Sequence, residues 1–164
     1  MEIPDSLLVV HAMALEHLGM FLDPAYTFDE RYQRLLAMKP QEADYERVFR
    51  GKLLDGARAL YGAMWGQPPP PLRGAPDQTR LWVRVAFADD FVAWNRRGAE
   101  FPGGYRKLAL DLVPGVVWVA WKFVAPGETT GLSFDGIVRL DDRFVWFPQP
   151  WRLAPIGGAT PTAG

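Results

Sequence analysis

The sequence predicts an α+β fold, with N-terminal helices packed on one face of a curved, mostly antiparallel sheet of four strands. Apolar residues recur at helical spacing as far as residue 65, and a proline-rich segment at 66–78 then interrupts the pattern. Beyond it, alternating or continuous apolar runs indicate strands. Because helices and strands are segregated along the chain, the pattern favours α+β over alternating βαβ units.

The chain has the size and composition of one globular domain. Its 164 residues are 49% hydrophobic, which is enough to bury a sizeable core. We expect a single domain over residues 1–151, followed by a flexible C-terminal tail at 152–164. The domain divides into a helical part (5–65), a proline-rich connector (66–78) and a sheet part (79–151).

Three helices are expected before the connector, at 5–22, 27–40 and 41–65. Thr27 and Glu30 have the spacing of a capping box, which marks the start of the second helix. Pro40 ends that helix, because the residue before a proline avoids the helical conformation. Three glycines weaken the third helix and leave a break in it open: Gly51, Gly56 and Gly62.

After the connector, strands are expected at 79–87, 116–124, 130–140 and 143–148. A short helix capped by Asp89 or Asp90 follows the first strand, and for 105–112 the pattern favours a helix over a strand. The Asp141-Asp142 pair fits a tight hairpin turn, which would pair Leu140 with Arg143.

Hairpin register then assigns each side chain to a face of the sheet. With Lys122 opposite Ser133 and Ala120 opposite Asp135, one face is wholly apolar and must be covered. The second face mixes aromatic and charged residues, and a one-residue slip in the first loop would exchange the faces of 116–124. Its predicted members are Trp118, Ala120, Lys122, Ser133, Asp135, Ile137, Arg139, Phe144 and Trp146.

This order of helices, strand, short helix and antiparallel meander is similar to that of the nuclear-transport-factor-2-like and cystatin-like proteins. The resemblance implies a cone-shaped fold, in which a curved sheet wraps around helices and often encloses a pocket or forms a sheet-mediated dimer. The similarity is one of element order, so no family motif carries a catalytic residue over to this chain.

Composition excludes several kinds of chemistry. The absence of cysteine rules out disulfides, thiolate catalysis and cysteine-ligated metals. A net charge of −1 argues against a nucleic-acid partner, and no phosphate-binding glycine motif occurs. His11 and His17 lie six residues apart, about 240° around a helix, so they cannot chelate one metal together. We expect no cofactor and no metal.

Other sequence features predict the location of the protein and two alternative roles for the proline-rich segment. The apolar N-terminal stretch is flanked by Glu2 and Asp5 and interrupted by Glu16, so it resembles neither a signal peptide nor a membrane span. We expect a cytoplasmic protein without membrane contact, although a trimmed precursor signal stays open. The Pro68–Arg73 segment matches a polyproline ligand motif and equally fits a stiff linker.

Two hypotheses of function follow. With two serines, two histidines and no cysteine, the chain favours a non-enzymatic module that binds a protein partner or a second copy, forming a homodimer. Its predicted contact residues are Trp118, Lys122, Asp135, Arg139, Phe144 and Trp146. The alternative is a small-pocket lyase or isomerase of an apolar molecule, with Asp135 as general acid/base and Lys122 or His17 as partners. A structural ion pair between Asp135 and Lys122 or Arg139 competes with that alternative.

Overall fold

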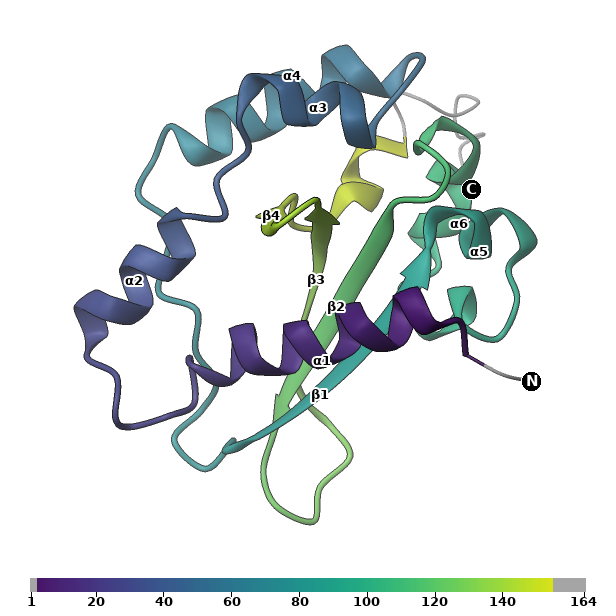
Figure 1. Ribbon diagram of the computed structural model, residues 1–164. Coiled ribbons are helices and arrows are strands. Elements are labelled where there is room, and N and C mark those ends of the chain that lie inside the picture. The colour runs from purple at the N-terminus through teal and green to yellow at the C-terminus, as the bar shows by residue number, and fades with distance from the viewer. Residues whose placement is uncertain (1–2, 155–164) are drawn as a thin grey trace, which may run out of the picture.

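A computed structural model describes residues 3–154 and has the predicted α+β class (Figure 1). Its four strands form one antiparallel sheet in the order β1-β2-β3-β4, and the sheet does not close on itself. The likeness to the nuclear-transport-factor-2-like and cystatin-like folds stays a prediction. The strands are β1 (Arg80–Phe87), β2 (Val117–Val124), β3 (Gly131–Leu140) and β4 (Arg143–Trp146).

Four helices precede the sheet and two short helices lie between its first strands. They are α1 (Asp5–Gly19), α2 (Phe28–Leu36), α3 (Glu42–Val48), α4 (Leu53–Trp65), α5 (Ala88–Ala93) and α6 (Gly104–Leu108). The predicted capping box is confirmed, since Glu30 N donates to Thr27 Oγ1 (3.1 Å) and Thr27 N donates to Glu30 Oε1 (2.9 Å). Within residues 3–154, no helix has both the length and the apolar character that crossing a membrane requires.

The third predicted helix is in fact two, α3 and α4. The chain extends at Phe49 and turns at Gly51, whose φ of +61° is a conformation that glycine adopts without strain. Phe49 also forms an isolated bridge with Leu112 and is fully buried. The break therefore lets one aromatic side chain leave the helix and enter the core.

The predicted register is confirmed at both hairpins. Leu140 pairs with Arg143, and Lys122 pairs with Ser133. Between these points, the β2·β3 register shifts by one residue around Ala120, which is a β-bulge in β3. Gly136 has a φ of +96°, and a Cβ there would clash with the Phe147 carbonyl oxygen, so the bulge depends on this glycine.

The bulge makes part of the predicted second face wrong. One extra residue turns every later side chain of β3 to the opposite side, and β4 follows because it pairs with β3. Val119 pairs with Ile137, which pairs in turn with Trp146, so these residues share the face of Trp121. The residues moved to that face are Ile137, Arg139, Phe144 and Trp146.

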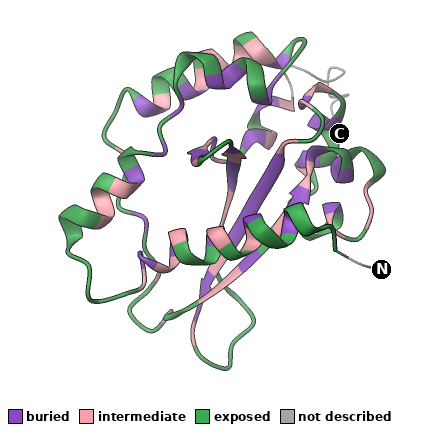
Figure 2. Cartoon of the chain, viewed as in Figure 1, coloured by how far each residue is buried: buried purple, intermediate pink, exposed green. Residues whose placement is uncertain are grey.

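Both faces of the sheet are covered around Val138 and Val145. Helix α1 lies across the Trp121 face, where Ala14 and Leu18 line a small gap with Ile137 (Figure 1). On the opposite face, Trp118 is fully buried between Phe49 and Tyr105, with ring centroids 6.2 and 5.7 Å away. Figure 2 shows this buried centre along β2 and β3.

The packed region extends past the predicted domain boundary at residue 151. A 3₁₀ helix, η3 (Pro150–Leu153), follows the sheet, and Leu153 is fully buried in the core. The described end of the chain, as far as Ala154, therefore packs on the domain. The other residues of the predicted tail, 155–164, lie outside the described residues.

Candidate functional site

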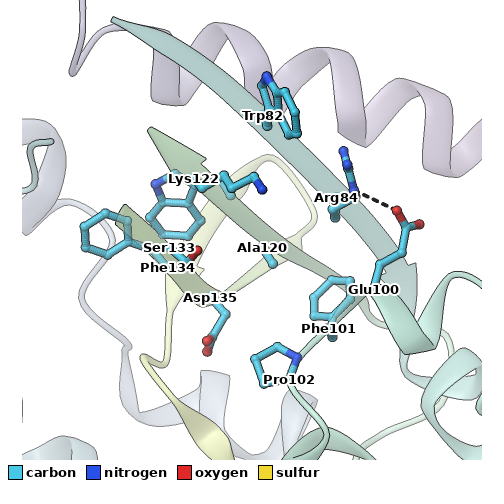
Figure 3. Close-up of a pocket in the computed structure, with 11 residues that line it drawn as sticks. Trp82, Arg84, Glu100, Phe101, Pro102, Ala120, Lys122, Ser133, Phe134 and Asp135 are labelled. Atoms are coloured by element: carbon cyan, nitrogen blue, oxygen red, sulfur yellow. Dashed lines mark ion pairs between the residues drawn. The ribbon is translucent and has the colours of Figure 1, made fainter. Parts of the chain in front are cut away.

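The uncovered half of the Lys122 face forms a cavity of about 480 Å³, which we call the sheet cavity (Figure 3). Side chains from three adjacent strands meet there because β1, β2 and β3 pair in register at this end of the sheet. The segment before α6 borders the cavity with apolar groups. Its lining includes Trp82, Arg84, Ala120, Lys122, Ser133 and Asp135 from the strands, and Glu100, Phe101 and Pro102 from that segment.

Asp135 is the half-buried carboxyl group of this cavity. Its Oδ1 accepts hydrogen bonds from Tyr105 Oη (2.8 Å) and from the Gln149 backbone N–H (3.1 Å). Its backbone carbonyl accepts a bond from Trp146 Nε1 (2.8 Å). Among the described residues, the side-chain hydrogen bonds of good geometry all reach Oδ1, and the Trp151 indole also lies near the carboxyl group.

The surroundings of Asp135 favour its protonated form. Burial raises the pKa of this carboxyl above its usual value of 3.8, although hydrogen bonds from Tyr105 and Gln149 and the nearby Trp151 indole oppose the shift. Trp151 Nε1 itself is buried without a hydrogen-bond partner of good geometry among residues 3–154. A carboxyl group with a raised pKa beside a cavity is a common feature of acid/base sites.

The cations of the sheet cavity have partners other than Asp135. Lys122 Nζ lies 4.5 Å from the centre of the Trp82 ring and donates to the Thr129 carbonyl oxygen. Arg84 Nε forms a 2.7 Å ion pair with Glu100 Oε2 at the exposed rim (Figure 3). Within residues 3–154 Asp135 makes no ion pair, so the competing structural pairing with Lys122 or Arg139 is not formed.

A second cavity of about 390 Å³, the connector groove, lies beside the sheet cavity. It shares Ser133, Phe134 and Asp135 with that cavity and is closed by Trp146 and by the prolines at 68–70. The connector packs on the domain, since Leu72 is buried and Tyr32 Oη donates to the Pro69 carbonyl oxygen (3.0 Å). Asp135 therefore lines both the sheet cavity and the connector groove.

The structure brings together only some of the predicted site residues. Lys122 and Asp135 line the same cavity, and Trp146 lies in the adjoining groove. Trp118 is 0% exposed and Phe144 is 5% exposed, so neither offers the open surface that the sequence predicted. His17 and Arg139 lie in a different cavity, beside Phe144, so the structure does not bring His17 into the cavities that Asp135 lines.

Sequence reasoning missed Tyr105, Gln149 and the role of Trp82. Tyr105 lay in a segment whose helical pattern predicted no particular contact, and Gln149 acts through its backbone. Trp82 and Arg84 alternate with the apolar residues of β1, and extending the register from β2 to β1 would have placed them beside Lys122.

Residues 3–154 contain no cluster of three histidine, aspartate or glutamate side chains arranged to hold a metal ion. The sheet cavity instead offers a carboxyl group, a lysine, a hydroxyl group and aromatic walls.

In comparisons with known proteins, no family model, no curated protein and no solved structure matches the chain.

Proposed function

We propose that the sheet cavity binds an apolar small molecule and that Asp135 acts on it as a general acid/base, in a lyase or isomerase reaction. The observation that carries the proposal is the position of the Asp135 carboxyl group. It is half-buried, it borders a cavity of about 480 Å³, and its side-chain hydrogen bonds of good geometry among the described residues all reach Oδ1.

The raised pKa of Asp135 suits proton transfer. A general acid/base works best when its pKa approaches the working pH, because both forms are then populated. Tyr105 and Gln149 fix the Oδ1 atom, so the carboxyl group keeps one orientation while Oδ2 takes up or releases the proton. No nucleophile or metal is needed for such a step.

The walls of the cavity set the class of molecule. Trp82, Phe101 and Pro102 offer flat apolar surfaces, and Ala120 leaves room at the floor. Lys122 and Ser133 lie side by side on paired strands and can hold one polar oxygen of the ligand. A cyclic or aromatic carbonyl compound fits this combination, with its oxygen toward Lys122 and an acidic C–H toward Asp135.

The experiment is a screen of uncharged cyclic ketones by NMR, with ¹³C-labelled alanine methyl groups and ¹⁵N-labelled indoles as reporters. We expect binding ketones to shift the Ala120 methyl and Trp82 indole signals. Ala120→Phe fills the floor and removes the alanine reporter, so the remaining Trp82 indole signal should no longer shift, whereas the exposed Ala63→Phe retains both shifts. If no ketone shifts either signal, or if Ala120→Phe binds as well as wild type, the cavity is not the binding site.

The chemistry is tested by deuterium exchange at the carbon next to the carbonyl of a bound ketone. Asp135 takes a proton from that carbon and returns a deuteron from D₂O, so the product differs only in isotope. We expect Asp135→Asn to bind the ketone and to lose exchange. Exchange that persists in Asp135→Asn would exclude this residue as the acid/base.

Assembly into a homodimer through the free edge of β3 is a second candidate function. Strand β4 pairs only with Ile137–Leu140, so Gly131–Asp135 forms a sheet edge. Leu132 is 46% exposed, and this stretch contains none of the lysines or prolines that commonly protect edges. Light scattering tests it: a dimer that Leu132→Lys converts to a monomer supports edge pairing, and a monomeric wild type at all concentrations refutes it.

A further inference from the structure

A separate cavity of about 420 Å³ lies where α1 and α2 meet the end of β3 and the start of β4, and we call it the arginine cavity. It is lined by three guanidinium groups, one imidazole and the two carboxylates of Glu16 and Asp142, and it shares no lining residue with the sheet cavity or the connector groove. The cationic and aromatic side chains that line it are those of His17, Arg34, Arg139, Arg143 and Phe144.

Two arginines of this cavity, Arg34 and Arg139, make no ion pair among the described residues, although the Asp142 carboxylate acts on Arg139 from a longer distance. Arg34 Nη1 donates to the His17 carbonyl oxygen (3.4 Å), and Arg139 Nε donates to the Asp141 carbonyl oxygen (3.1 Å). Within residues 3–154, no carboxylate lies within 4.0 Å of either guanidinium. Arg143 differs, because it is paired with the buried Asp44.

Both arginines are also partly removed from water. The Arg139 guanidinium lies 4.7 Å from the centre of the Phe144 ring, and the His17 ring lies 4.8 Å from the same ring. A guanidinium without a counter-ion in such a place has lost hydration without gaining a salt bridge. A bound anion would supply the missing partner and accept bidentate hydrogen bonds.

We propose that the arginine cavity binds a doubly charged oxyanion, the phosphate or sulfate group of a small molecule, through Arg34 and Arg139. The neutral His17 imidazole donates one further hydrogen bond to the anion. Among residues 3–154, the one hydrogen-bond partner of its Nε2 is the Met38 sulfur, a weak acceptor, at 3.4 Å. The charged groups facing His17 are Glu16 on α1, Arg34 on α2, Arg139 on β3, Asp142 in the turn and Arg143 on β4.

His17 provides a built-in reporter of binding. Burial and the charges of Arg34 and Arg139 lower its pKa from 6.5 to about 4. An anion between those arginines would cancel part of their charge and raise this pKa. The chain has only one other histidine, His11, which serves as the internal control. It lies on another part of α1, and its Nε2 lies 3.2 Å from the Val83 carbonyl oxygen of β1.

The experiment follows both histidines by NMR pH titration with sodium sulfate, and with sodium chloride at equal ionic strength. We expect sulfate to raise the pKa of His17 by about one unit and to leave that of His11 unchanged. Isothermal titration at pH 7 measures the affinity independently. Equal shifts of both histidines, or equal shifts in chloride, would show simple screening and overturn the proposal.

Variants identify the ligands of the anion. Arg34→Gln and Arg139→Gln should each raise the sulfate dissociation constant about tenfold, because each removes a charged donor. Arg139→Lys keeps the charge but loses the planar fork, and should also weaken binding. Arg50→Gln is the matched control, since Arg50 likewise donates to a carbonyl oxygen, that of Leu110, outside the cavity. Unchanged affinity in both glutamine variants would refute the assignment.

The source of the anion is distinguished by comparing inorganic phosphate, inorganic sulfate and phenyl phosphate. Tighter binding of phenyl phosphate indicates a phosphate ester whose organic part contacts Met13 or Phe144 at the cavity wall. Equal binding of all three indicates a site for the free ion. Absence of binding by all three contradicts the proposal, and leaves the assignment of Asp135 in the sheet cavity unaffected.

Discussion

The Tyr105 hydroxyl donates a 2.8 Å hydrogen bond to Asp135 Oδ1 and joins α6 to the bulged strand β3. Tyr105 is fully buried, and burial together with the Asp135 charge raises the pKa of its hydroxyl well above 10. The proton therefore stays on Tyr105, and the bond stabilises the ionised form of Asp135.

Tyr105→Phe removes that bond, so we expect the pKa of Asp135 to rise further. Loss of a hydrogen bond to a carboxylate should also lower the free energy of unfolding at neutral pH by about 2 kcal/mol. Carboxyl ¹³C NMR titration measures the first effect and urea unfolding the second. Tyr32→Phe, which removes a bond to the Pro69 carbonyl oxygen, is the control and should leave the Asp135 pKa unchanged.

The raised pKa of Asp135 makes the fold less stable as pH rises. Between the unfolded pKa near 3.8 and the higher folded pKa, the native state binds more protons than the unfolded chain. The contribution of Asp135 to the free energy of unfolding therefore falls with increasing pH across this window. Asp135→Asn carries no titrating proton, and its urea unfolding should lack this decrease. Asp135→Asn and wild type with the same pH dependence across this window would contradict the assignment.

Asp90 should show the opposite pH dependence. Burial alone would raise its pKa, but bonds from Arg97, Asn95 and the Phe87 N–H outweigh burial and hold the pKa below 3.8. The ionised carboxylate therefore stabilises the fold above the unfolded pKa, and this contribution is lost as pH falls through the lowered folded pKa.

Replacing Asp90 by Asn leaves Arg97 with a weaker partner, so the free energy of unfolding at pH 7 should fall by about 3 kcal/mol. The difference from wild type should shrink as the pH falls below 3.8 toward the lowered folded pKa of Asp90, because protonation then removes the same charge from the wild type. Urea unfolding at pH 7 and through this acidic range checks this. Asp89→Asn is the matched control on the same helix, with an exposed side chain that bonds the Gly115 N–H.

The sequence predicts the fold class and the hairpins because these depend on local pattern. Turn residues fix the β3·β4 register, and Lys122 and Ser133 pair as the loop length requires. The bulge at Asp135 and Gly136 could not be predicted, because it depends on the packing of Gly136 against the Phe147 backbone. The alternation of apolar and polar residues along β3 does not reveal that contact. The single extra residue of the bulge moved Arg139 and Phe144 to another cavity.

The bulge itself gives a further prediction, because it holds the Asp135 carboxyl group in place. Gly136→Ala forces a Cβ onto a φ of +96° and into the Phe147 carbonyl oxygen. Gly127 is the matched control: its φ is +82°, and nothing lies within 4 Å of a Cβ there. Both variants bear the conformational strain, about 1–2 kcal/mol, and only Gly136→Ala adds a backbone clash.

We therefore expect Gly136→Ala to lower the free energy of unfolding by at least about twice as much as Gly127→Ala. It should also shift the pKa of Asp135 toward 3.8, because displacement of the strand opens the carboxyl group to water. Gly127→Ala should leave that pKa unchanged, since its loop lies beyond the paired part of β3. Urea unfolding and carboxyl NMR measure the two effects, and equal losses of stability in both variants would mean that the bulge can form without glycine.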